Sequence, residues 1–373
     1  MGSSFSIGSI AGIRIALHPS WLVIAFLVTF SLASASLPRT FPGWEPAWYW
    51  AVAALVALLF FGSVLAHELS HALVARRFGI KVRDITLFVF GGAATLEGDA
   101  RSPRQEALIA FAGPLTSLLL GALFLGIGFV VGQEQVVAVI GWLAFINFIL
   151  GVFNLIPGFP MDGGRILRAL IWKVRGDQLA ATRTAATVGR YFGYGLIGLG
   201  AFIAFQVDTF NGIWLALIGW FLSSAAESSI AQASLQRVLR GVKVRDVMDA
   251  EPASVNPNET VADLVNERLM RGEDRSFLVR HLDGGLAGIV TLSDIRRLGR
   301  DDWPNARVTD IMTRHADLAI VGPDDELESA LDTLQQREVN QLPVVDSDGR
   351  TVLGLLTRAG ILRLVDTRMK LGV

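Results

Sequence analysis

Residues 51–71 read AVAALVALLFFGSVLAHELSH, an apolar run that ends in two histidines and a glutamate. A helix needs about 20 apolar residues to cross the hydrocarbon core of a bilayer, so this stretch predicts a membrane span over residues 48–75. An ionisable side chain inside a span costs about 2.5–3.5 kcal/mol on insertion scales. The cost of placing His67, Glu68 and His71 there indicates that these residues have a chemical function.

The spacing of these three residues is that of a metal site. Residues four apart lie on the same face of a helix, so His67 and His71 in the H-E-x-x-H pattern can converge on one Zn²⁺. Glu68, beside the first ligand, can exchange protons with a water that the metal makes acidic. The alternative is a pair of packing histidines beside a neutralised glutamate, which leaves three costly residues in a span without a function.

A catalytic zinc normally has three protein ligands and an open position. The chain has no cysteine and only five histidines, and of the other three only His18 lies near a predicted span. The best remaining candidate is Asp162, in the run NLIPGFPMDGGR at residues 154–165. Pro157 and Pro160 break the helix there. The alternative role for Asp162 is a helix cap at the membrane interface.

Charge density changes sharply near Arg237. Residues 1–236 carry 25 of the 67 charged side chains, and residues 237–373 carry the other 42. The net charge of −1 is unlike that of a nucleic-acid-binding protein. We therefore expect a membrane domain followed by a water-soluble one, with no nucleic-acid partner.

Six apolar segments in the first part are long enough to span the bilayer. They are residues 19–37, 48–75, 106–131, 136–156, 186–206 and 212–232. Lysines and arginines gather in alternate loops, which predicts that both termini and the charged C-terminal block are cytoplasmic. Residues 21–35 also resemble a signal peptide, but the run is long enough to span and we expect it to be retained.

The H-E-x-x-H pattern and the motif Asn-x-x-Pro-x-x-Pro-x-Asp-Gly at residues 154–163 together resemble the site-2 protease family of intramembrane zinc metalloproteases, over about residues 1–235. The resemblance implies that Zn²⁺ is bound by His67, His71 and Asp162. It implies that Glu68 is the catalytic acid/base. The family cleaves transmembrane segments of other proteins, so a transmembrane substrate and the lipid bilayer are the implied partners, and the cell membrane is the implied location.

Two further features belong to this resemblance. Asn154 would help to hold the substrate or polarise the scissile carbonyl; its alternative role is a hydrogen bond between helices. Residues 85–96 are β-rich and too short to span as a helix, and the resemblance suggests a membrane-associated sheet that holds the substrate extended. A purely structural hairpin is the alternative. The Gly113–Pro114 pair, which the family shares, is interpreted as structural.

The C-terminal part contains an internal repeat. VRDVM at residues 244–248 matches VTDIM at 308–312, and GIVT at 288–291 matches GLLT at 354–357. The repeat resembles a pair of CBS domains, a family that commonly binds adenine nucleotides between its two copies. We predict that the membrane domain covers residues 1–236, a linker 237–243, the first repeat 244–307 and the second 308–373.

In that family a threonine and an aspartate contact the ribose. The first repeat has Thr291 and Asp294, whereas the second has Thr357 but Gly360 in the place of the aspartate. The resemblance therefore implies one site for AMP, ADP or ATP. The alternative is that these residues cap helices and that the pair only forms a homodimer.

We therefore expect a polytopic α-helical membrane domain of six transmembrane helices with a small membrane-associated β segment, followed by a cytoplasmic α/β CBS pair. The predicted function is zinc-dependent cleavage of transmembrane segments, with one zinc per chain and modulation by an adenine nucleotide. The alternative is a CBS-regulated transporter or ion channel that uses the His, Glu and Asp side chains as an ion path.

Overall fold

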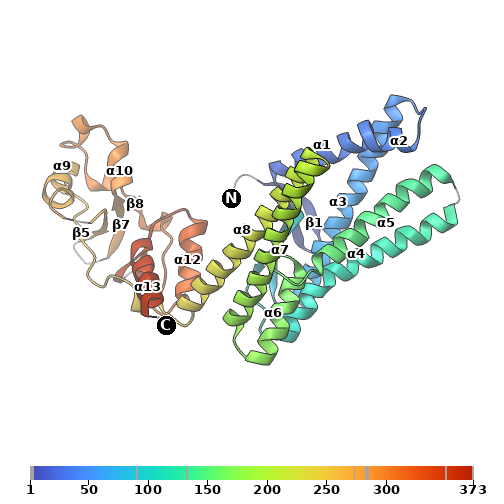
Figure 1. Ribbon diagram of the computed structural model, residues 1–373. Coiled ribbons are helices and arrows are strands. Elements are labelled where there is room, and N and C mark those ends of the chain that lie inside the picture. The colour runs from blue at the N-terminus through green and yellow to red at the C-terminus, as the bar shows by residue number, and fades with distance from the viewer. Residues whose placement is uncertain are drawn as a thin grey trace. The chain divides into compact units, whose positions relative to one another are not determined.

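The computed structural model describes residues 4–89, 91–131, 133–272, 274–281, 285–348 and 351–371. The chain forms two compact units, Met1–Ala233 and Ser234–Val373 (Figure 1). This division lies close to the change in charge density near Arg237, but the exact domain and linker boundaries stay a prediction. Phe90, within the predicted β-rich stretch, lies outside the described residues.

The first unit is dominated by long apolar helices. Among the described residues, six helices are long and apolar enough to cross a membrane, which confirms the predicted architecture. The first covers Pro19–Thr40 and combines α1 (Pro19–Ser31), a π-helical turn (Leu32–Ser36) and α2 (Leu37–Thr40). The others are α3 (Pro46–Arg77), α4 (Pro103–Val131), α5 (Glu134–Asn154), α7 (Gln178–Gln206) and α8 (Thr209–Leu239). A shorter amphipathic helix, α6 (Asp162–Arg175), follows α5 and packs against α4 and α7.

A four-stranded sheet packs against α3. Its order is β1 (Phe5–Ile10), β2 (Ile13–Leu17), β3 (Lys81–Phe88) and β4 (Gly91–Glu97). β2 and β3 are parallel, and the other neighbours are antiparallel. Ile13, Ile15 and Ile85 are buried in one cluster with Ala72 of α3, so the sheet is fixed to the helix that carries the two histidines.

The β3–β4 hairpin confirms the predicted β segment, whereas the β1–β2 hairpin has no counterpart among the sequence predictions. Its turn places Ala11 and Gly12 at φ values of 52° and 76°. Asn-Gly or Asp-Gly is the usual signal for a two-residue turn with two positive φ angles. Because alanine stands in the first of these places, the signal for the hairpin is weak.

Among the described residues, the second unit contains the two repeats and three buried hydrophobic clusters. Its strands are β5 (Ser254–Val255), β6 (Ser276–Arg280), β7 (Leu286–Thr291) and β8 (Thr313–Arg314) in one sheet, and β9 (Gln341–Val345) and β10 (Val352–Thr357) in another. Its helices are α9 (Val261–Asp263), α10 (Leu292–Arg297), α11 (Val308–Ile311), α12 (Leu327–Gln336) and α13 (Arg358–Leu371).

The two repeats exchange their opening segments. Val244, at the start of the first repeat, is buried in the core formed by residues of the second. Val308, at the start of the second, is buried in the core of the first. In the same reciprocal way, a Cβ on Gly354 would meet Met248 and a Cβ on Gly288 would meet Met312. The two copies therefore form one interlocked α/β unit, as expected for a CBS pair.

Candidate metal centre

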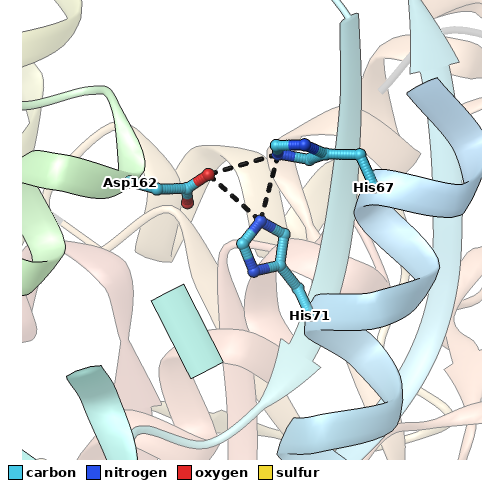
Figure 2. A group of neighbouring side chains, drawn as sticks. All are labelled: His67, His71 and Asp162. Atoms are coloured by element: carbon cyan, nitrogen blue, oxygen red, sulfur yellow. Dashed lines mark hydrogen bonds and ion pairs between the residues drawn. The ribbon is translucent and has the colours of Figure 1, made fainter. Parts of the chain in front are cut away.

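Two helices bring three potential metal ligands together. His67 and His71 lie one turn apart on α3, and Asp162 is the first residue of α6. Nε2 of His67 lies 3.2 Å from Oδ2 of Asp162, and Nε2 of His71 lies 3.1 Å from the same oxygen. The two Nε2 atoms are 3.3 Å apart. Figure 2 shows the three side chains pointing toward one another from the two helices.

The donor set fits a zinc ion. A tetrahedral ion bound at about 2.0–2.1 Å holds its ligand atoms about 3.3 Å from one another, close to all three observed separations. The three residues are buried, with exposed fractions of 3% for His67, 6% for His71 and 9% for Asp162. Because three groups with lone pairs converge in a buried place, the arrangement requires a cation or extra protons between them.

Both imidazoles are oriented by helix α4. Nδ1 of His71 donates to the backbone oxygen of Ile109 at 2.6 Å, and Nδ1 of His67 lies 2.9 Å from Oγ of Ser117. A carbonyl only accepts, so the proton of His71 resides on Nδ1 and its Nε2 lone pair faces the centre. Metal-binding histidines commonly have such a partner for their other nitrogen. Neither partner was predicted from the sequence; a serine inside the apolar α4 helix was the available signal for Ser117.

Gly113 lies between these two partners on α4. A Cβ on Gly113 would lie 2.6 Å from Nε2 of His67 and closer still to Nε2 of His71. The sequence analysis treats Gly113 as structural, but the structure places it directly beside the two candidate ligand atoms. Only glycine leaves this face of α4 open toward the histidines.

Asp162 is placed by close backbone packing. Pro157 and Pro160 lie in the irregular loop that follows α5, and the two residues after Asp162 are glycines that pack tightly on the backbone of this loop. A Cβ on Gly164, for example, would lie 2.6 Å from the backbone oxygen of Gly158. Where extra protons rather than a cation occupy the centre, burial would raise the pKa of the Asp162 carboxyl, but hydrogen bonds from the protonated Nε2 atoms of His67 and His71 outweigh it and hold this pKa below its usual range.

Glu68 is a residue of α3, and its side chain packs against β4 of the sheet. A Cβ on Gly92 of β4 would lie 3.0 Å from Cδ of Glu68 and 3.2 Å from its Oε1. Glu68 also interacts through charge with His71 and Asp162. In the sheet order, β4 is the last strand, and its outer edge has no partner strand among the residues that the structure describes. The carboxylate therefore lies near the candidate ligand cluster and against the face of the last strand of the sheet.

Asn154 lies shortly before the candidate ligand Asp162 in the sequence, but its side chain makes its hydrogen bond elsewhere. It is the last residue of α5, and its Nδ2 donates to the backbone oxygen of Leu150 at 2.9 Å. This bond lies within one helix. No hydrogen bond joins Asn154 to His67, His71 or Asp162 in the described part of the chain.

His18 has a structural contact. It is the N-cap of α1, where its Nδ1 accepts from the backbone nitrogen of Ser20 at 3.2 Å. Its own backbone nitrogen donates to Leu87 of β3 at 2.9 Å. The side chain therefore caps the first span, and it does not belong to the three-residue metal cluster.

Thr291 and Asp294 form a capping box at the start of α10. Oδ2 of Asp294 accepts from the backbone nitrogen and the hydroxyl of Thr291 at 2.9 and 2.7 Å. In the second repeat, the Thr357 hydroxyl accepts from the backbone nitrogen of Gly360 at 3.0 Å. Helix capping, the alternative weighed for these residues, thus occurs in both repeats, and only the first adds a carboxylate.

Comparisons with known proteins decide the family. The model of peptidase family M50 matches residues 55–136 and 131–200, and the CBS domain model matches residues 244–301 and 308–367. Rip3 of Mycobacterium tuberculosis, named as a zinc metalloprotease, is 36% identical over 370 residues, which cover 98% of this chain and 94% of that protein. The chain belongs to peptidase family M50.

Other relatives of this M50 protease agree. A protein of Synechocystis sp., also named as a zinc metalloprotease, is 36% identical over 98% of this chain and 97% of its own length. The solved site-2 protease from Methanocaldococcus jannaschii is 30% identical and covers 61% of this chain and 95% of that one, with a TM-score of 0.45. The chain is thus a multi-pass zinc metalloprotease with a CBS pair, and the transporter interpretation is not favoured.

Proposed function

We propose that His67, His71 and Asp162 bind one catalytic Zn²⁺ per chain and that Glu68 is the acid/base for cleavage of a peptide bond in a transmembrane segment. The convergence of the three ligand atoms within 3.1–3.3 Å of one another is the observation that carries the proposal. A zinc bound there would polarise the scissile carbonyl and make a water acidic near neutral pH.

The residues of the chain supply the proton transfers and the alignment. Glu68 accepts a proton from the attacking water, whose oxygen bonds to the carbonyl carbon of the substrate. Glu68 then gives this proton to the departing amide nitrogen as the C–N bond breaks. Ser117 and the Ile109 carbonyl hold the imidazoles of His67 and His71 in place during these steps.

The substrate we propose is a transmembrane helix that is locally unwound. A helical peptide bond is covered by its own backbone hydrogen bonds, whereas an extended strand can pair with a sheet edge. The last strand, β4, packs against Glu68 at Gly92, and its outer edge, which has no partner strand among the described residues, offers this pairing near the acid/base. Asn154 would help to hold this segment or polarise its carbonyl, for which its Nδ2 must leave Leu150.

The CBS pair is proposed as an adenine-nucleotide sensor. Thr291 and Asp294 at the start of α10 would contact the ribose of AMP, ADP or ATP, and Gly360 leaves the second repeat without the equivalent carboxylate. We place the protease in the plasma membrane with its termini and CBS pair in the cytoplasm, which the alternating loop charges support. Homodimerisation through the CBS pair belongs to the same proposal.

The test compares the wild-type chain with Glu68→Gln in cells and after purification. Membrane fragments with ends inside spanning segments should appear in quantitative proteomics with the wild type and disappear with Glu68→Gln. The purified variant should still contain one zinc per chain, because Glu68 is not a ligand. Glu45→Gln, an exposed change at the start of the same helix, is the matched control. Continued cleavage by Glu68→Gln would refute the assignment.

A further inference from the structure

A metal site built from two separate helices needs something to fix the distance between them. His67 and His71 lie on α3, whereas Asp162 begins α6, a 14-residue helix outside the six candidate spans. Metal–ligand distances tolerate errors of about 0.2 Å. Arg168, six residues beyond Asp162 on the same helix, makes the contacts that can hold α6 in place.

Arg168 makes two contacts that link α6 to its surroundings. Its Nε and Nη2 both donate to Oε1 of Glu106, in the first turn of α4. Its guanidinium also lies over the ring of Phe159, 5.3 Å from the ring centroid. Phe159 is three residues before Asp162 and is buried in a cluster with Ala185 of α7. One side chain therefore joins the helix that begins at Asp162, the loop before it, and α4.

The position of Glu106 on α4 gives this contact its significance. Ile109, which accepts the hydrogen bond from His71, lies three residues further along the helix, and Ser117, which contacts His67, lies two turns beyond Ile109. The same helix thus supports both histidines through Ile109 and Ser117, and supports the helix of Asp162 through Glu106. α4 is the common frame for all three candidate ligands.

Stability alone does not explain the ion pair between Glu106 and Arg168. The side chain of Glu106 is 0% exposed and that of Arg168 is 18% exposed. Oε2 of Glu106 is buried without a hydrogen-bond partner among the described residues. Replacing a buried ion pair by well-packed apolar residues is often neutral or stabilising, because desolvation offsets the attraction. What an apolar pair lacks is the fixed direction of a guanidinium–carboxylate contact.

We propose that the Glu106–Arg168 ion pair is a positioning element that sets the Asp162 carboxylate at the metal. This inference rests on the proposed function, because it takes Asp162 as a zinc ligand. Neither residue touches the substrate or the metal; both act through the placement of α6. Loss of a group that orients a metal ligand commonly weakens metal binding about 10–100-fold, and we expect an effect of this size here.

The experiment separates positioning from folding. The full chain is purified as the wild type, Arg168→Lys and the double variant Glu106→Leu/Arg168→Met, and the zinc Kd is measured by competition with a chelator. Thermal unfolding is measured on the metal-free proteins, and the visible absorption bands of bound Co²⁺ report the ligand geometry. Arg175→Gln, an exposed change on the same helix, is the matched control.

We expect the zinc Kd to rise about 10–100-fold in the double variant and in Arg168→Lys, with altered Co²⁺ bands. The unfolding temperature of the metal-free double variant should be unchanged or higher, and Arg175→Gln should match the wild type. Wild-type zinc affinity and Co²⁺ bands in both Arg168→Lys and the double variant would overturn the inference. If the double variant fails to fold, Arg168→Lys decides alone, because lysine keeps the charge but lacks the two guanidinium donors to Glu106 and the planar contact with Phe159.

His71→Ala distinguishes this outcome from failure of the proposed function. If the wild type binds no zinc, or if His71→Ala binds it equally well, the proposed metal site is wrong and the inference falls with it. If His71→Ala loses zinc while Arg168→Lys and the double variant keep wild-type affinity, the metal site stands and only the role of Glu106 and Arg168 is refuted.

Discussion

Adding one methyl group at Gly113 should empty the metal site. A Cβ there would lie 2.6 Å from Nε2 of His67 and closer still to Nε2 of His71, whereas real Cβ atoms stay at least 3.0 Å from such neighbours. The imidazole of His67 would have to move by at least about 0.4 Å, twice the tolerance of about 0.2 Å for a metal–ligand distance. We expect Gly113→Ala to weaken zinc binding more than about 100-fold, beyond the usual loss of an outer-shell partner.

The assay measures zinc per chain and zinc Kd in the purified protein, with cleavage as a second readout. Gly126→Ala is the control, because Gly126 lies in the same helix and a Cβ there meets nothing within 4 Å. Alanine is favoured over glycine inside a helix by about 0.5–1 kcal/mol, so propensity gives no reason for either variant to unfold. One zinc per Gly113→Ala chain, bound with wild-type affinity, would refute the geometric reasoning.

Three further changes test separate parts of the account. Gly92→Ala should displace the Glu68 carboxyl and slow cleavage about 100-fold with zinc content unchanged; an unchanged rate would contradict the contact. Ser117→Ala should raise the zinc Kd about 10–100-fold in a chelator competition, and an unaltered Kd would show that His67 needs no such partner. Asp294→Ala should lower the stability of the CBS unit by about 0.5–2 kcal/mol in thermal unfolding and abolish ATP binding in calorimetry; retained ATP binding would exclude it from the nucleotide site.

The three candidate ligands could be identified from the sequence because local geometry determines much of their arrangement. Helical periodicity alone places His67 and His71 on one face, and the apolar run around them places that face in a membrane. Asp162 is identified by the helix-breaking prolines at the end of the fourth span. The loop charges indicate that this segment and the two histidines lie toward the same side of the membrane. Neighbouring residues and the charges of the loops are therefore enough to identify these three side chains.

The supporting contacts depend on helix packing that the sequence does not reveal. Ile109 contributes a backbone oxygen, which any residue could provide, so no side-chain pattern identifies it. Glu106 and Arg168 are 62 residues apart, and each alone resembles an ordinary charge at a membrane interface. Gly113 resembles any helix-packing glycine until the two histidines are seen beside it.

Zinc X-ray absorption spectroscopy of the purified full chain tests the central claim most directly. The wild type should contain one zinc, with two imidazole nitrogens and a carboxylate oxygen at about 2.0–2.1 Å. His71→Ala should show one imidazole fewer or no bound zinc. A wild-type spectrum without imidazole scattering, or a spectrum that His71→Ala leaves unchanged, would contradict the proposed metal site.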